Sequence, residues 1–416
     1  MKLTRARASK HPNARPDIGV ARQPIFGTAG DVAGYGLVSC HSVSDPRRVA
    51  ATDVVVKAIV SIGLEQLTAG RAAYVGFTPD MLIEGAYTTL PRDGVVVELL
   101  GTMEPDDRVE FACEQLVNAG YTLALDDCAA GYSERLLELA TVVKVDVHDL
   151  PPERLDAIAQ ELAVYDVRLL AVRVATRQMR ALCAGLGYEL FHGNYYARAE
   201  MVQDRTLRSD ELAIVRALNA LRDAQASDAE SVFATDRRLA ARLLRVLNAD
   251  TRAGGIESVQ HALRLGARQQ LGTWLLLFLA WTIAAREPVT RELLHLAMQR
   301  ARLCELLAGS AGRPHDGHSM FVVGLFSLLD VVAGMPMDTL LGAVAVDPLV
   351  RAALRERTGP YAVLLTIAEA WEQGDWTTVR RHAWPAGIDA SGISALYLQS
   401  LVWSREHLRV VNASAA

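Results

Sequence analysis

Short apolar runs alternate with amphipathic stretches through the first half of the chain. The apolar runs lie near residues 19–25, 32–38, 72–78, 93–100, 121–126, 142–147, 167–174 and 188–196. Stretches with helical spacing lie between several of them, for example 53–67, 106–119 and 176–186. Apolar strands separated by helices are typical of a parallel sheet that is covered by helices. Eight such strands predict a closed, TIM-like β/α barrel.

The pattern changes near residue 200, after which only helical periodicity is found. Leu239, Leu243 and Leu247 repeat at helical spacing, for example. The sequence therefore predicts a multidomain chain with a barrel at 18–203 and an all-α domain at 204–405. A basic tail at 1–17 and a C-terminal tail at 406–416 would flank them. Because the junction has no Gly/Ser/Pro linker character, we expect the two domains to pack firmly.

Composition narrows the classes of partner. The net charge of −5 argues against nucleic acid or an anionic membrane as a partner. Residues 269–285 carry no charge, but the run is short for a membrane span and favours a buried core helix. The five cysteines are scattered without a C-x-x-C pair, and no signal peptide is visible. These features predict a cytoplasmic protein with reduced thiols.

Three short strings in the first half carry a family resemblance. Residues 22–26 read RQPIF, residues 121–133 read YTLALDDCAAGYS, and residues 142–146 read VVKVD. In this order and spacing they resemble the EAL family, which hydrolyses cyclic di-GMP on a β/α barrel. The resemblance implies a site at the carboxyl ends of the strands, where two divalent cations activate water for attack on a phosphodiester.

Several of the positions that this resemblance assigns to the site carry other residues here. The chain keeps four of them, Glu98, Asp126, Asp127 and Lys144. It differs at the family's metal-binding, basic or phosphate-holding positions, which are Gly36, Cys40, Gly76, Val172, Ala175 and His192. A glycine has no side chain to offer a metal, and a valine cannot accept a proton. The resemblance therefore implies no catalytic residue, no bound metal and no cofactor, and it predicts that the chain is not an enzyme. The retained carboxylates and Lys144 would either form a structural ion pair or a residual ligand site.

The second half resembles the HDOD module of bacterial signalling proteins. The resemblance rests above all on GLFSLLD at 324–330 and GMPM at 334–337. His315 and Asp316 are adjacent there, but they lie in a Gly/Pro/Ser-rich loop and do not predict a metal site. The two resemblances together imply a non-catalytic signalling protein that acts through a protein partner, which the sequence does not identify. Two alternatives stay open, a cyclic di-GMP receptor without turnover, with weak binding, and a residual metal-dependent phosphodiesterase.

Overall fold

A computed structural model defines most of both predicted domains. The residues that it describes are 20–39, 55–56, 58–60, 63–101, 106–126, 132–197, 207–222, 233, 236–250, 255–284 and 288–415. The predicted tail at 1–17 lies outside them, as do the candidate site residues Cys40 and Asp127.

Eight strands close into a barrel, as the sequence predicts. They follow the chain order around the barrel: β1 (Val20–Gly27), β2 (Val32–Ser39), β3 (Ala72–Phe77), β4 (Val95–Leu99), β5 (Thr122–Leu125), β6 (Val142–Asp146), β7 (Arg168–Val172) and β8 (Leu190–His192). The outer helices and turns are α2 (Leu64–Thr68), α3 (Pro79–Ile83), η1 (Ala86–Thr89), α4 (Asp107–Asn118), α5 (Glu134–Leu139), α6 (Pro152–Leu162), α7 (Arg177–Gly185) and η3 (Asn194–Ala197). Apolar side chains that point inward fill the barrel, among them Ile25, Val96 and Leu170.

Strand β1 runs antiparallel to both of its neighbours, β2 and β8, whereas the other adjacent strands pair in parallel. The prediction of a parallel sheet is therefore wrong for β1. The reason is the short connection between β1 and β2, four residues that include Gly30 at φ +79°. So short a turn joins only antiparallel strands, because a parallel crossover needs a dozen residues or more.

The second domain is entirely helical in the part of the chain that is described. Its helices are α8 (Ser209–Arg222), α10 (Arg237–Asp250), α11 (Val259–Arg264), α12 (Arg268–Ala284), α13 (Pro288–Ser310), η4 (Pro314–Asp316), α14 (Gly317–Phe326), α15 (Leu329–Ala333), α16 (Met337–Ala343), α17 (Pro348–Arg355), α18 (Gly359–Gln373), α19 (Trp376–Ala383) and α20 (Ala390–Ala415). Residues 406–415, which we expected to be a tail, continue α20.

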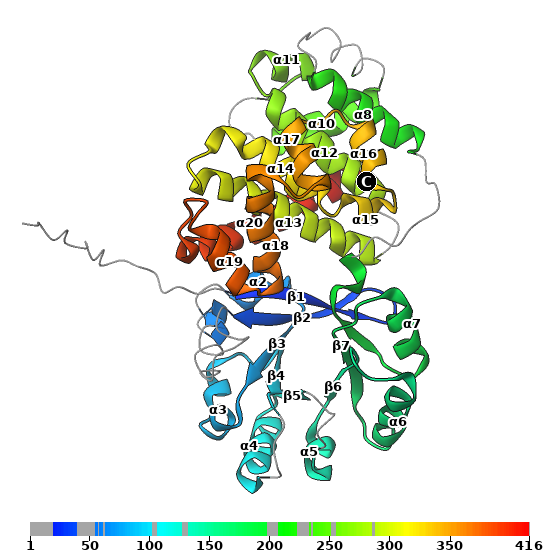
Figure 1. Cartoon of the computed structure of the whole chain (residues 1–416), viewed down its shortest axis with the longest axis vertical. Helices are drawn as coiled ribbons and strands as arrows, with labels where there is room; N and C mark the ends of the chain where they lie inside the picture. Colours follow the sequence, from blue (N-terminus) through cyan, green and yellow to red (C-terminus); the bar gives the residue numbers. More distant parts are fainter. Residues whose placement is uncertain are drawn as a thin grey trace, which may run out of the picture.

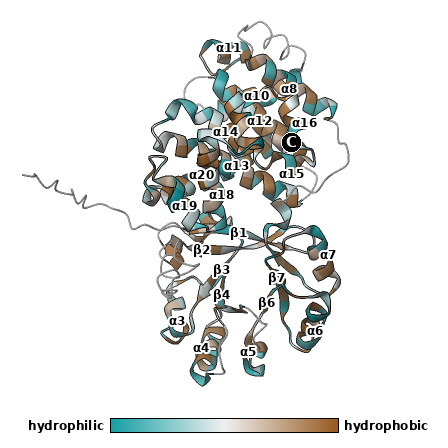
Figure 2. Cartoon of the chain, viewed as in Figure 1, coloured by the Kyte–Doolittle hydropathy of each residue, from teal (hydrophilic) through white to brown (hydrophobic). Residues whose placement is uncertain are grey.

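The uncharged run at 269–285 falls largely in α12, most of whose apolar side chains are buried inside this domain. Figure 2 shows the hydrophobic colouring concentrated in such inner elements of both domains. Among the described helices, none combines the length and the apolar character that crossing a bilayer requires.

The two domains pack directly against each other, which confirms the firm packing expected from the junction. Figure 1 shows β1 and β2 at the boundary, below α13, α18 and α20. The contact is polar as well as apolar. The backbone N–H of Arg22 on β1 donates to the Tyr397 hydroxyl on α20 at 3.2 Å. The Tyr35 hydroxyl on β2 donates to Glu292 on α13 at 2.9 Å. The barrel is therefore held in one orientation to the helical domain.

Candidate functional site at the mouth of the barrel

The carboxyl ends of the parallel strands form the mouth of the barrel, above the apolar layer. Glu98 lies on β4, Asp126 directly follows β5, and Lys144 lies on β6. Because these strands are neighbours in the sheet, the side chains at their carboxyl ends can meet. We call these three residues the mouth cluster. Three of the four retained residues are thus brought together, and the fourth, Asp127, is outside the described residues.

Lys144 is the centre of the mouth cluster. Its ammonium lies 3.1 Å from Glu98 Oε1 and 2.8 Å from Asp126 Oδ1. Glu98 is only 8% exposed, so it is a buried charge that depends on its partner. Burial alone would lower the pKa of Lys144, but the charges of Glu98 and Asp126 outweigh it and raise that pKa above its ordinary value. Lys144 therefore stays charged and forms an ion pair with each of the two carboxylates.

Gly36 and Gly76, two of the positions that differ from the family pattern, differ in the space around them. A Cβ at Gly36 would approach only the backbone oxygen of Gln23, at 3.9 Å, so this position leaves room at the mouth. A Cβ at Gly76 would lie 2.7 Å from the side chain of Leu100, which already fills that place. A ligating side chain at position 76 would therefore require Leu100 to move.

His192, the third residue of β8, forms a hydrogen bond with Gln23. Its Nε2 lies 2.9 Å from Gln23 Oε1. Burial and the charge of Lys144 lower the pKa of His192 to about 4, so the ring is neutral at neutral pH. The Gln23 amide nitrogen is used on the other side, where it donates to the carbonyls of Glu372 and Gln373 at 3.4 and 3.2 Å. This arrangement requires the His192 tautomer that carries its proton on Nε2.

A pocket of about 260 Å³ opens beside the mouth cluster, and we call it the mouth pocket. It contains His192 and Ala175, two of the positions that differ from the family pattern; Val172 lies on β7 directly before Arg173, which lines it. The helical domain contributes Gln373 to the wall. The hydrogen-bonding side chains that line it are Gln23, His148, Arg173, His192, Asn194, Tyr196 and Gln373.

Arg173 is the cation of the mouth pocket. It follows β7, with its backbone at φ +57°, and its side chain is about half exposed, at 55%. The Asp146 carboxylate accepts from its Nε, and Asp149 lies 3.5 Å from Nη2. Arginine in such a setting still presents further N–H groups, and it is well suited to a phosphate. The family pattern gave no role to this position, and only its place after a β7 strand end could have indicated it.

A second group of residues, which we call the interface cluster, was not predicted. It consists of Arg22, Tyr35, Glu292, His295 and Gln299, all buried between β1, β2 and α13. The Arg22 guanidinium donates to the Leu67 carbonyl at 3.0 Å and to Gln299 at 3.5 Å, and it lies 4.5 Å from the centre of the Tyr35 ring. The only sequence signal was a charged residue, Arg22, inside the largely apolar run of β1.

The same cluster sets the charge of Glu292. Burial alone would raise the pKa of this carboxyl, but His295, Arg22 and Tyr35 together lower it. Glu292 is therefore a carboxylate, and it matches the positive Arg22 across the boundary between the domains.

The adjacent His315 and Asp316 lie in η4, at the start of α14. Asp316 accepts from the Tyr361 hydroxyl at 2.9 Å and pairs with Arg313 at 2.7 Å. These contacts fix the loop between α13 and α14, so the observed role of Asp316 is structural.

The residues described at the mouth do not fit a pair of divalent cations. In the mouth cluster, Lys144 already lies between the carboxylates of Glu98 and Asp126, and Asp146 is paired with Arg173. Within the described ranges, no three His, Cys, Asp or Glu side chains are close enough to share a metal ion. A two-metal centre needs most of its oxygen ligands from such groups.

The full chain is similar to two curated proteins. It is 28% identical over 406 residues to the cyclic di-GMP phosphodiesterase CdgJ of Vibrio cholerae, which covers 94% of this chain and 93% of CdgJ. It is 25% identical to the uncharacterized protein YuxH of Bacillus subtilis, over 92% of this chain and 97% of YuxH. No protein-family model matches the chain.

Among solved structures, the barrel is similar to the EAL domain of Mycobacterium smegmatis DcpA. The two are 17% identical with a TM-score of 0.35, over 42% of this chain and 89% of that domain.

These comparisons correct one prediction. We expected a chain that is not an enzyme, but its relative CdgJ is named as a phosphodiesterase and matches both domains. The prediction counted lost side chains against one family pattern. Such a count takes no account of groups that the pattern omits, such as Arg173 and Gln373. The chain is similar over nearly its whole length to CdgJ, which is named as a cyclic di-GMP phosphodiesterase.

Proposed function

We propose that this chain acts in cyclic di-GMP signalling, as an EAL-type barrel joined to an HDOD-type helical domain. The observation that carries the proposal is the similarity to CdgJ, which extends through both domains without a large gap in coverage. The reaction proposed is the one for which CdgJ is named, cleavage of a phosphodiester bond of cyclic di-GMP. The helical domain would present its surface to a protein partner.

The mouth pocket supports a nucleotide ligand by its chemistry. Arg173 offers a guanidinium to a phosphate, and Asn194 and Gln373 place amide groups along the same pocket. Amide side chains pair well with the donor and acceptor edge of a base such as guanine. At about 260 Å³ the pocket suits one nucleotide portion, and the rest of the ligand would extend over the mouth cluster.

The experiment is to measure binding and turnover on the purified full chain. Calorimetric titration with cyclic di-GMP gives the affinity, and chromatography of the nucleotide after incubation with Mg²⁺ or Mn²⁺ gives the product. We expect saturable binding, and we expect that Arg173→Ala weakens it by about tenfold or more through loss of a charge-assisted contact.

The matched control is Arg168→Ala. Arg168 begins the same strand at the opposite end of the barrel, and it pairs with Glu189 at 3.0 Å on the surface. Failure of the wild-type chain to bind would overturn the proposal. Equal weakening by both variants would reject the mouth pocket as the site. Binding with no product under either metal would reject the proposed reaction and retain the site.

A further inference from the structure

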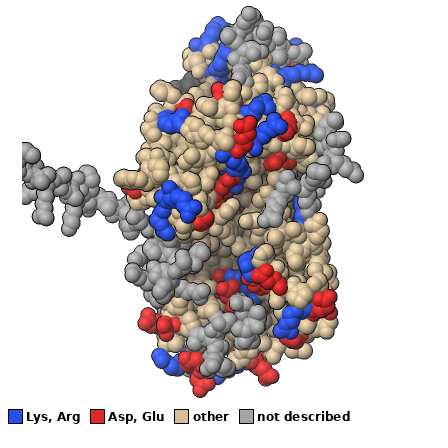
Figure 3. All heavy atoms as spheres, in the orientation of Figure 1, with Lys and Arg blue, Asp and Glu red and all other residues tan. Residues whose placement is uncertain are grey.

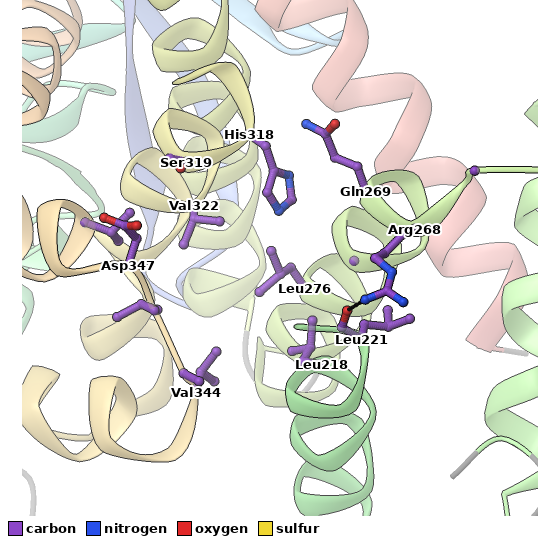
Figure 4. Close-up of a pocket in the computed structure, with 15 residues that line it drawn as sticks. Leu218, Leu221, Arg268, Gln269, Leu276, His318, Ser319, Val322, Val344 and Asp347 are labelled. Carbon is purple, nitrogen blue, oxygen red and sulfur yellow. Dashed lines mark hydrogen bonds between the residues drawn. The ribbon is translucent and has the colours of Figure 1, made fainter. Parts of the chain in front are cut away.

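A second cavity lies wholly within the helical domain, and we call it the helical cavity. Its volume is about 500 Å³, which is within the range of small-molecule sites. Its walls come from α8, the start of α12, α14, the segment before α17 and α17 itself (Figure 4). It shares no lining residue with the mouth pocket.

Hydrogen bonds between the elements that form its walls fix the spacing of this cavity. The Asn219 amide on α8 donates to the Ala343 carbonyl at 3.0 Å and accepts from the Ala345 N–H at 3.0 Å. Arg268 on α12 donates to the Leu221 carbonyl of α8 at 2.8 Å. The segment before α17 and the start of α12 are therefore both fixed to α8, so the cavity is preformed.

Gly272 in the second turn of α12 keeps the cavity open. A glycine inside a helix costs about 1 kcal/mol relative to alanine, so its presence calls for a reason. Close packing is not the reason here, because the nearest atom to a Cβ at this position would be His318 Cε1, at an ordinary contact distance of 3.9 Å. Its lack of a side chain leaves room between α12 and α14.

The body of the cavity is apolar. Leu218 and Leu221 come from α8, Leu276 from α12, Val322 from α14 and Val350 from α17. Such a lining favours a ligand with an aromatic ring or a short hydrocarbon chain, because its burial removes apolar surface from water.

The polar groups of the cavity favour an uncharged ligand. Arg268 and Asp347 have opposite charges and lie on opposite sides (Figure 4). Each is already engaged with the backbone, Arg268 with Leu221 and Asp347 with the N–H of Leu349 at 2.8 Å. A charged ligand would be attracted by one and repelled by the other, while losing its own hydration.

His318 is a lining group that remains available to a ligand. Its ring projects from α14 between Val322 and α12 (Figure 4). Among the residues that the structure describes, neither ring nitrogen has a hydrogen-bond partner. Burial lowers the pKa of His318, so the neutral ring offers one donor and one acceptor.

We propose that the helical cavity is a binding site for a small uncharged molecule with an apolar body and one hydrogen-bonding group that meets His318. The site would make the helical domain a receptor for a second signal, separate from the ligand of the barrel. This inference does not depend on the function proposed for the mouth.

Three probes with one ring system and different charge test this proposal. Indole is neutral, indole-3-acetate is an anion and tryptamine is a cation at neutral pH. Their binding to the full chain can be measured by ligand-observed NMR titration. We expect saturable binding of indole, and affinities for the two charged probes that are lower by more than about tenfold, because each would bury an unpaired charge.

Variants locate the binding. Gly272→Leu fills the cavity and should abolish indole binding, whereas Gly309→Leu introduces the same residue on α13 at a position with no atom within 4 Å and should not. His318→Phe keeps the ring and removes its hydrogen bond, so we expect a loss of about fivefold. Should Gly272→Leu fail to fold, Val322→Phe fills the same space from α14.

Three results would overturn the proposal. They are the absence of saturable indole binding up to its solubility limit, indole binding that survives both filling variants, and tighter binding of either charged probe.

Discussion

The mouth pocket takes its lining from both domains, whereas the helical cavity takes its lining from one. The mouth is organised by charge, with Lys144 between two carboxylates and Arg173 beside Asp146. The cavity is organised by apolar packing, and its charged groups are engaged with the backbone. Where charges are buried against each other, loss of one member leaves the others uncompensated. Where apolar walls surround a space, substitutions change its volume and leave the rest of the domain in place.

The largest expected effect is a loss of folding stability when the charge of the mouth cluster is removed. Lys144→Met should lower the free energy of unfolding by about 3–5 kcal/mol, because Glu98 and Asp126 are then left without their cation. Urea denaturation followed by circular dichroism would measure it. Adding Glu98→Gln to this variant should recover part of the loss. Arg168→Met, which breaks a surface pair, should cost less than about 1 kcal/mol. If Lys144→Met costs no more than that control, the mouth cluster is not held by its charges.

A smaller effect is expected at the boundary between the domains. Arg22→Ala removes the guanidinium bonds to Leu67 and Gln299 and should cost about 2–3 kcal/mol, in the range for hydrogen bonds of charged groups. The exposed Arg216 on α8 is the control, with an expected change within about 0.5 kcal/mol. Arg22→Ala should also expose the boundary to limited proteolysis while indole binding to the helical cavity is retained. A variant that loses both sites together would show that the comparison between them is wrong.

The most gradual expected effect is a pH dependence. The folded-state pKa of His192 is about 4, below its unfolded value of about 6.5. The unfolded chain therefore binds this proton first, and stability falls as the pH is lowered from about 6.5 toward 4, by roughly 1 kcal/mol per pH unit at most. His192→Gln keeps a donor toward Gln23 and should remove this part of the slope. Denaturation curves between pH 7 and pH 4 would check it, and identical slopes in both proteins would contradict the assignment.

The sequence reveals the barrel more fully than it reveals the contacts between domains. The positions of the eight strands follow from apolar runs, because burial on both faces is a local property of each run. The direction of β1 is not contained in such a run, although the short Gly-containing turn after it is a hairpin signal. The mouth cluster could be inferred because its members lie at successive strand ends.

Other features depend on distant parts of the chain. Arg22 meets Gln299 across 277 positions, and no periodicity relates them. Gln373 reaches the mouth from the end of α18, far outside the strings that resemble the barrel family. The helical cavity also could not be predicted from the sequence, because a single glycine in a long apolar helix does not indicate an open space.

Figure 3 shows that on the face drawn there, basic and acidic side chains lie close together on both domains. A net charge of −5 could not indicate that distribution.

The alternation of side chains along β1 restricts how this protein can evolve. Arg22 faces α13, whereas its neighbour Gln23 faces the mouth, where it contacts His192 and the end of α18, because successive residues of a strand point to opposite sides. Insertion or deletion of one residue here would exchange the two directions and remove both contacts at once. Recombination that joined this barrel to an unrelated domain would leave Arg22 and Tyr35 without the groups that match them. A substitution on β1 can therefore disturb the boundary between the domains, the mouth, or both.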